Sequence, residues 1–400
     1  MTVSSADERV RVLYWFNQPT PYVVARFNAA AERPELDFHA VFSEVRQSDR
    51  SWDVDESTWN FPARYLTRIK LPLRELVKLR PDVFLLEYDR WNLAVGAVLG
   101  LVYARRVGFR VLPNFDAWSQ RTWWREVGKH VLFKAIDGVK VSGPDGAALA
   151  TRYGLPEDRI ATVTQSINVA HYSRSRNMAA EERHCRREEL GLSGCVFIYV
   201  GRLWAGKGLD DLFEAYRQLC AIRSDVSLLI VGDGVEYERY VGCFSDIPGV
   251  KFAGFVQPDA LPEWYSICDA LVFPTQGDPN GLVVDEALAA GLPVITSDAA
   301  GDIWTRVPET VGYIFPVGDV DALLKAMLML ADPLNRQPMS HEASKWVEQK
   351  HDERYAQDLV RFVQNLVRQP RRRAALRSIC SVLGRLLSGP RRVHGLTPRP

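Results

Sequence analysis

Two carboxylates stand on either side of a glycine in the segment TQGDPNGLVVDEALAAGLPVITSD, residues 275–298. Asp278 lies in a loop after an apolar, strand-like run, and Glu286 follows eight positions later among helix formers. The helix-forming run starts at Gly281 and stops at Gly291, a natural C-cap before the next strand. The two acids therefore flank the start of one predicted helix.

A helix that begins at Gly281 directs the amides of Gly281, Leu282 and Val283 outward, and an N-terminus of this kind binds phosphate. Glu286 falls in the second turn, close enough to reach a sugar hydroxyl, and Asp278 could accept hydrogen bonds from a second sugar. Two plainer interpretations stay open. Asp278 could be a turn or cap residue, and Glu286 a dipole-favoured acid on an exposed face.

A second candidate for anion binding is FIYVGRLWAGKGLDDLFEAYRQL, residues 197–219. A predicted strand ends at Gly201, a loop carries Arg202 and Lys207, and an amphipathic helix begins near Gly208. The fork of an arginine and the point charge of a lysine suit a diphosphate at the carboxyl end of a strand. Solvated charges on a connecting loop are the alternative.

Short apolar runs alternate with helix-length amphipathic segments along the chain, which is typical of parallel sheets covered by helices. The predicted strands of the first half are 11–16, 38–42, 83–87, 109–113, 138–142 and 160–164. Those of the second half are 195–201, 226–234, 250–254, 270–275 and 292–297. The fold class is therefore α/β, with two Rossmann-like, doubly wound parallel-sheet domains that face a central cleft.

The charge-dense segment 174–194 separates the two series of strands, and we expect a linker and a surface helix there. The expected domains are residues 1–175 and 176–365, followed by a basic amphipathic tail at 366–400.

The composition is that of a soluble globular protein, with 47% apolar residues, 25% charged residues and a net charge of +1. Near-neutrality argues against nucleic acid as a partner. The six cysteines are irregularly spaced, which predicts neither a zinc site nor a disulfide framework and fits the cytoplasm. The N-terminus lacks the features of a signal peptide, and the apolar run 93–104 is too short to span a bilayer, so we expect a buried helix there.

Five motifs occur in a fixed order: VGRLWAGKGLDDLFEAY, LLIVGDG, VKFAGFVQPDALPEWYSICDALVFPT, DPNGLVVDEALAAGLPVITSD and GYIFPVGDVDAL. This order, over roughly residues 195–330, resembles the C-terminal half of the retaining glycosyltransferases of family four, which have the GT-B fold. In the first half, NQPTPYVVARFNAAAERPELDFHAVF is similar to bacterial members that build surface polysaccharides and lipid-linked glycans. The resemblance implies a nucleotide-sugar donor and a glycan or lipid-linked acceptor.

The resemblance also implies roles for single residues. Glu286 holds the ribose of the nucleotide, and Arg202 and Lys207 hold the diphosphate. Asp278 binds the hydroxyls of the transferred sugar, and Val256 in the motif GFV borders the base. Backbone amides at three positions assist Asp278: Asn280, Gly281 and Leu282.

The sequence departs from the family pattern at three places. Asp278 replaces a glutamate, and Asn280 stands where an aromatic residue is usual. The family's histidine in the N-terminal domain is absent, because LPNFDAW has Phe115 before Asp116, and Asp116 or Asn114 could replace it only in part.

The acceptor side of the expected cleft belongs to the first domain. Asn17, Tyr22 and Arg26 follow the first strand and should face the cleft. Tyr22 and Arg26 are four positions apart and could share one helix face, with an ordinary helix surface as an equal alternative.

Two basic, apolar segments suggest peripheral contact with an anionic membrane. Residues 64–82 alternate Arg and Lys with Leu and Ile, and residues 367–395 place arginines around an apolar stripe. Such segments can lie in the interface of an anionic leaflet. A solvated tail is the alternative.

These features together predict a hexosyltransferase-type glycosyltransferase at the cytoplasmic face of the membrane. We expect no cofactor and no metal, because the two cations and the helix N-terminus can stabilise a leaving diphosphate. One alternative is a catalytically weak nucleotide-sugar-binding subunit, which Asp278 and the missing histidine suggest. Another is a nucleotide-sugar epimerase of similar fold, whereas a dinucleotide oxidoreductase is disfavoured because no G-x-G-x-x-G follows the first strand of either domain.

Overall fold

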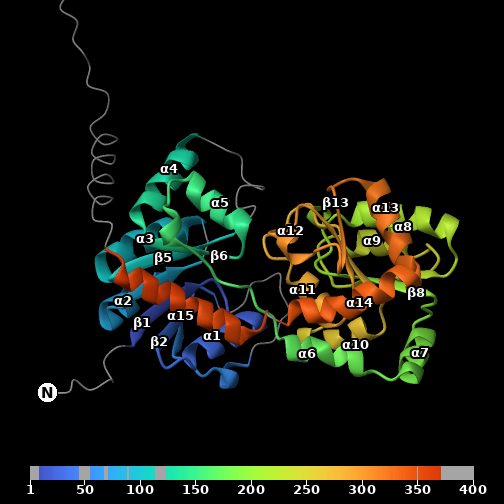
Figure 1. Ribbon diagram of the computed structural model, residues 1–400, viewed down its shortest axis with the longest axis horizontal. Coiled ribbons are helices and arrows are strands. Elements are labelled where there is room, and N and C mark those ends of the chain that lie inside the picture. Colours follow the sequence, from blue (N-terminus) through green and yellow to red (C-terminus); the bar gives the residue numbers. More distant parts are fainter. Residues whose placement is uncertain are drawn as a thin grey trace, which may run out of the picture.

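The computed structural model describes residues 9–44, 55–66, 71–87, 90–112, 123–348 and 350–370. Two parallel sheets lie side by side in it, each covered by helices on both faces (Figure 1). This arrangement confirms the predicted α/β class with two doubly wound domains.

The first sheet has seven strands in the order β3-β2-β1-β4-β5-β6-β7. Their bounds are Val10–Phe16 for β1, Leu36–Phe42 for β2, Ala63–Tyr65 for β3, Val83–Leu86 for β4, Arg106–Val111 for β5, Gly138–Val141 for β6 and Ile160–Thr162 for β7. The chain order reverses between β1 and β4, so the ends of these two strands border the crevice where ligands of such sheets bind.

The second sheet has six strands in the order β10-β9-β8-β11-β12-β13. Their bounds are Cys195–Val200 for β8, Val226–Val231 for β9, Val250–Gly254 for β10, Ala270–Phe273 for β11, Val294–Ser297 for β12 and Gly312–Phe315 for β13. The reversal here lies between β8 and β11, and the loops after these strands carry the predicted site.

The helices of the first half are α1 Pro21–Ala31, α2 Leu73–Leu79, α3 Arg90–Tyr103, α4 Trp123–Ala135, α5 Pro144–Arg152, α6 Val169–Ser173 and α7 Ala180–Glu189. Those of the second half are α8 Leu209–Ile222, α9 Tyr237–Phe244, α10 Leu261–Ser266, α11 Leu282–Ala289, α12 Ile303–Arg306, α13 Val320–Ala331, α14 Pro333–Val347 and α15 Asp352–Arg368. Helix α7 has no buried residue, as expected for the surface helix between the domains.

The core follows from alternation along buried strands. In β8, Val196 and Ile198 face one apolar cluster, and Phe197 and Tyr199 face the other. The predicted apolar face of α8 is buried throughout. Sequence reasoning missed the strands β3 and β13, which are short and lie at sheet edges, where few apolar residues are needed.

Helix α15 crosses back from the second domain and lies beside α1 on the first sheet (Figure 1). Its apolar face, including Tyr355, Leu359 and Val363, belongs to the same core cluster as Val12 and Phe27. The expected range 176–365 for the second domain therefore includes a helix that packs on the first sheet. This helix ties the two domains together.

The apolar run 93–104 is a helix as predicted, but the expectation that it is buried is wrong. Val98 is 58% exposed and Val102 is 68% exposed on α3. The opposite face packs closely, because a Cβ added at Gly100 would lie 2.7 Å from the Phe84 side chain. Only one face of α3 is covered because the helix belongs to an outer layer. In the described parts of the chain, no helix is both long and apolar enough to cross a bilayer.

Candidate functional site

The loop after β8 brings Lys207 to the end of β11. Gly208 has a left-handed φ of +68°, and a Cβ added to it would lie 2.0 Å from the carbonyl oxygen of Pro274. Glycine at this position therefore allows the loop to lie directly on the neighbouring strand. Lys207 is 8% exposed, and its Nζ lies 2.5 Å from Oδ2 of Asp278.

Asp278 joins this lysine to the start of α11. Its Oδ1 accepts hydrogen bonds from the amides of Asn280 at 2.8 Å and Gly281 at 2.7 Å. Burial alone would raise the pKa of the Asp278 carboxyl, but Lys207 and these amides hold that pKa below its usual range. Asp278 is thus an ionised turn residue and an ion-pair partner at once.

The helix does not begin quite as predicted. It starts at Leu282, and Gly281 is the N-cap in the left-handed region, with φ of +48°. The amide of Gly281 does not point outward, because it donates to Asp278. The amides of Leu282 and Val283 belong to the first turn, whose N–H groups lack partners within a helix. Of the three amides predicted to bind an anion, these two therefore remain candidates.

Arg306, on α12, fixes the same loop from behind. Its guanidinium donates to the carbonyl oxygens of Asn280 at 2.6 Å and Gly281 at 2.8 Å. It also pairs with Asp285 at 2.9 Å, and Lys350 lies 2.9 Å from the other oxygen of this carboxylate. Asp285 is fully buried. Sequence reasoning missed this group, although an acid among the apolar residues of α11 requires a buried partner.

Glu286 lies in the second turn of α11, as predicted. The hydroxyl of Tyr265 donates to its Oε2 at 3.2 Å. Burial raises the pKa of Glu286 to about 7, although hydrogen bonds from Tyr172 and Tyr265 oppose the rise. A buried carboxyl with a raised pKa is typical of functional sites.

Two further predicted donor residues lie near the site in different settings. Arg202 is exposed, and its carbonyl oxygen accepts a hydrogen bond from Tyr199 at 2.8 Å. Val256 is partly buried and packs against the core cluster that contains Val284 of α11. The structure therefore brings Lys207, Asp278 and the start of α11 into direct contact.

On the acceptor side, Asn17 follows β1 and is partly buried. Tyr22 and Arg26 do share one side of α1, since the Arg26 guanidinium carbon lies 5.2 Å from the centre of the Tyr22 ring. Arg26 is 4% exposed, so the alternative of an ordinary helix surface is wrong for it. It points inward because Ser166, beneath α1, accepts its hydrogen bonds. Asp116 lies outside the described residues.

Asn280 connects the two domains. Its Oδ1 accepts hydrogen bonds from Nη2 of Arg110 and from Nε2 of Gln165, both at 2.7 Å. Both donors belong to the first domain. Asn280, which stands where the family usually has an aromatic residue, therefore makes a contact across the cleft. The sequence signal for the partner was a cation within the buried strand β5, which sequence reasoning did not use.

A second contact between the domains joins Asp302 and Asp145. Oδ1 of Asp302 accepts from the amide of Asp145 at 3.0 Å, and the amide of Asp302 donates to the Asp145 carboxylate at 3.3 Å. Asp302 has a left-handed φ of +52°, which is uncommon for a residue other than glycine.

The geometry suits the binding of an anionic group rather than nucleophilic chemistry. A buried lysine, two helix-end amides and a neighbouring arginine can surround a diphosphate, and Glu286 is an acceptor for hydroxyl groups. The described residues contain no group of three or more His, Cys, Asp or Glu side chains that could hold a metal ion.

Comparison with known proteins finds similarity to glycosyltransferases. Residues 194–332 match a family model described as Glycosyl transferases group 1. The sulfoquinovosyl transferase SQD2 of Arabidopsis thaliana is 34% identical over 42% of this chain and 32% of its own length. The GDP-mannose-dependent monoacylated alpha-(1-6)-phosphatidylinositol monomannoside mannosyltransferase of Corynebacterium glutamicum is 30% identical over 42% of this chain and 48% of its own length. This chain thus spans about a third to a half of these relatives.

Among solved structures, HepE of Anabaena in complex with UDP and glucose superposes with a TM-score of 0.70. The identity is 17%, and the superposition covers 89% of this chain and 100% of that one. With its two parallel-sheet domains, this chain has the GT-B fold.

Proposed function

We propose that this protein is a glycosyltransferase that moves a sugar from a nucleoside diphosphate sugar to an acceptor hydroxyl, with retention of configuration. The observation that carries the proposal is the pair of Lys207 and Asp278 at the start of α11, at the reversal point of the second sheet. The group 1 glycosyltransferase match of residues 194–332 supports it, because those residues contain the whole pair and the helix.

In this proposal each side chain has a distinct task. Lys207, Arg202 and the first-turn amides of α11 bind the diphosphate and stabilise the negative charge that develops as it leaves. Glu286 accepts hydrogen bonds from the ribose, and Asp278 orients both Lys207 and the transferred sugar. These charges offset the diphosphate without a metal, so we propose a metal-independent reaction.

We further propose that the product is a surface glycan or glycolipid made at the cytoplasmic face of a membrane. The relative from Corynebacterium glutamicum supports this, because its name specifies a glycolipid acceptor. The exposed side chains of Val98 and Val102 on α3 offer apolar contact for such an acceptor.

A nucleotide-sugar-binding subunit with weak catalysis is the second candidate. One observation favours it: Oδ2 of Asp278 is engaged by Lys207, and Oδ1 accepts two amides. A transferred sugar would have to share this carboxylate with them.

Turnover separates the two candidates. Purified protein is incubated with UDP-, GDP-, ADP- and dTDP-sugars and a lipid extract, and transfer and donor hydrolysis are followed. We expect transfer or slow hydrolysis in the wild type, loss in Lys207→Met and no change in Lys251→Met, since Lys251 is exposed on β10. Donor binding without any turnover would favour the binding subunit.

A further inference from the structure

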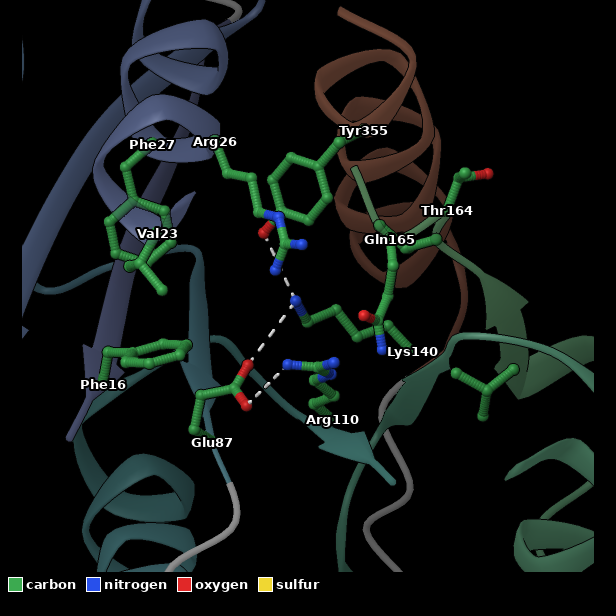
Figure 2. A pocket seen from close by; sticks show the side chains of 12 residues that line it. Phe16, Val23, Arg26, Phe27, Glu87, Arg110, Lys140, Thr164, Gln165 and Tyr355 are labelled. Carbon is green, nitrogen blue, oxygen red and sulfur yellow. Dashed lines mark hydrogen bonds and ion pairs between the residues drawn. The ribbon is translucent and has the colours of Figure 1, made fainter. Parts of the chain in front are cut away.

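A second polar site lies inside the first domain, in a cavity at the carboxyl ends of its strands (Figure 2). Three cationic head groups converge there: Arg26 from α1, Arg110 from β5 and Lys140 from β6. Their exposures are 4%, 7% and 5%. Among the described residues that line the cavity, Glu87, directly after β4, is the one carboxylate. The glycosyl transfer proposed above gives these cations no task.

The Glu87 carboxylate is shared among several partners. Its Oε2 lies 3.4 Å from Nη1 of Arg110, and its Oε1 accepts from the Tyr14 hydroxyl and lies 3.6 Å from Nζ of Lys140. Lys140 also donates to the hydroxyl of Tyr355 at 3.3 Å. The contacts of both cations with the carboxylate are longer than an ideal charge-assisted hydrogen bond.

Arg26 adds a third positive charge, and the nearby carboxylate of Asp352 is joined to it through Ser166. Its Nε donates to Oγ of Ser166 at 3.1 Å, and Ser166 in turn donates to Asp352 at 2.6 Å. Three cations thus face Glu87 inside the cavity and Asp352 behind Ser166, which leaves one positive charge unbalanced, and unbalanced buried charge is costly. Burial, together with the charges of Arg110 and Arg26, lowers the pKa of Lys140 to about 7 against the opposing effect of Glu87.

The sheet itself does not account for the cluster. Arg110 and Lys140 stand directly opposite each other in the parallel pair β5 and β6. Like charges at such positions destabilise a sheet, and strands covered on both faces are ordinarily apolar. An anion between these side chains would relieve the repulsion.

The cavity also adjoins the site of the second domain. Arg110 donates from Nη2 to Asn280, in the loop that holds Asp278. The enclosed space is about 10 Å³, and it reaches about 340 Å³ when the open mouth is counted. The cavity therefore has room for about one water-sized atom, such as one oxygen of an anion.

We propose that Arg26, Arg110 and Lys140 bind a phosphate or carboxylate group of the acceptor. They thereby hold the acceptor hydroxyl against the loop that contains Asp278. This inference rests on the proposed glycosyl transfer and adds the substrate class, an anionic acceptor.

The first test uses sulfate as the probe, because a ligand that binds only the folded state raises the melting temperature. Sodium chloride is replaced by millimolar sodium sulfate at constant ionic strength. We expect the rise of the wild type to persist in large part in Lys207→Gln, which removes the anion site of the second domain, and to be clearly smaller in Lys140→Gln and in Arg110→Gln, which keep that site. A rise that disappears in Lys207→Gln and persists in the other two variants would overturn the proposal.

A second arm needs no variant, in case the buried substitutions prevent folding. Sulfate keeps its charge between pH 6 and 9, while Lys140 loses its proton near pH 7 among Arg26, Arg110, Glu87 and the surrounding tyrosines. The sulfate effect on the wild type should therefore weaken as pH rises through this range. An effect that is independent of pH, or absent at pH 6, contradicts the assignment.

The third arm identifies the acceptor. Glucose 6-phosphate, glucuronic acid and glucose are compared as acceptors with the donor found by turnover. We expect at least about tenfold higher kcat/KM for one of the two anionic sugars, lost in Lys140→Gln while its nucleoside diphosphate affinity is kept. Equal use of glucose would overturn the anionic acceptor but leave the transferase intact, whereas failure of the wild type to bind any nucleoside diphosphate would overturn the proposed function instead.

Discussion

At the residue scale, Asp278 combines two tasks that sequence reasoning treated as alternatives. It is a turn residue, because its Oδ1 accepts the amides of Asn280 and Gly281 in its own loop, and it is a site residue, because its Oδ2 holds Lys207. The shorter side chain of aspartate suits this double contact, since the carboxylate stays close to its own loop. Lys207 in turn needs a counter-charge because it is 8% exposed.

Substitutions at Asp278 should separate these tasks. Asp278→Ala leaves Lys207 without its carboxylate and two amides without an acceptor, so we expect the free energy of unfolding to fall by about 2–3 kcal/mol. Asp278→Asn keeps an acceptor for the amides and should lose only about 1–2 kcal/mol. Urea unfolding measures both. Equal losses of less than about 0.5 kcal/mol would show that the pair is not structural.

Glu286 should make stability depend on pH. Burial raises its pKa to about 7 in the folded chain, against about 4.3 in an unfolded one, so between these values the folded state binds more protons. The free energy of unfolding from this group should therefore fall as pH rises from about 4.3 to about 7. Urea unfolding at pH 5, 6, 7 and 8 measures this, and Glu286→Gln should remove the dependence. A dependence retained in the variant would assign the titration to another group.

At the scale of elements, α11 is held at its start by backbone conformation and by side chains from other elements. Gly281 takes φ of +48°, and a Cβ added there would lie 3.0 Å from the Phe273 ring. The Arg306 guanidinium donates hydrogen bonds to two carbonyl oxygens of the same turn and forms an ion pair with Asp285. The position of the first-turn amides therefore depends on α12 as well as on α11.

Gly281→Ala tests this dependence. We expect a loss of about 1–2 kcal/mol in the free energy of unfolding, because a side chain in the left-handed region is strained, and weaker binding of a nucleoside diphosphate. Gly242→Ala is the matched control: Gly242 lies in α9 with open space around the added Cβ, and helix propensity predicts a gain of up to about 1 kcal/mol. Equal effects of the two substitutions would contradict the role of Gly281.

Much of the order and extent of the helices and strands could be predicted from the sequence. Runs such as CVFIYVG and LVFPT have the periodicity of buried strands, so the two series of strands and the start of α11 within one residue followed from local pattern. The pairing of Asp285 with Arg306 and Lys350 could not be predicted, because it joins α11, α12 and the loop between α14 and α15. The exposure of α3 was missed because an apolar helix sequence does not say which faces its neighbours cover.

At the scale of the whole molecule, three features join the domains: the crossing of α15, the contact of Asp302 with Asp145, and the contact of Asn280 with Arg110 and Gln165. The contact of Asn280 with Arg110 and Gln165 lies between the loop that holds Asp278 and the cavity lined by the three cations. Such cross-domain contacts have no local sequence signal, and for this reason the acceptor side was predicted far less fully than the donor side.

Asn280→Ala should loosen the domain interface. It removes one acceptor from two donors, so we expect the free energy of unfolding to fall by about 1–2 kcal/mol and the radius of gyration from X-ray scattering to increase. Asn335→Ala is the control, because the side chain of Asn335 donates to the carbonyl oxygen of Met329 in its own domain. Superimposable scattering curves for the wild type and Asn280→Ala would show that this contact does not hold the domains closed.

The central claim is that Lys207 and the start of α11 bind the diphosphate of a nucleotide-sugar. Calorimetric titration of UDP, GDP, ADP and dTDP into the wild type, Lys207→Met and Lys251→Met tests it most directly. We predict that at least one nucleotide binds the wild type and Lys251→Met equally, and binds Lys207→Met at least about tenfold more weakly, as expected for the loss of a charged hydrogen bond. Unchanged affinity in Lys207→Met would contradict the account.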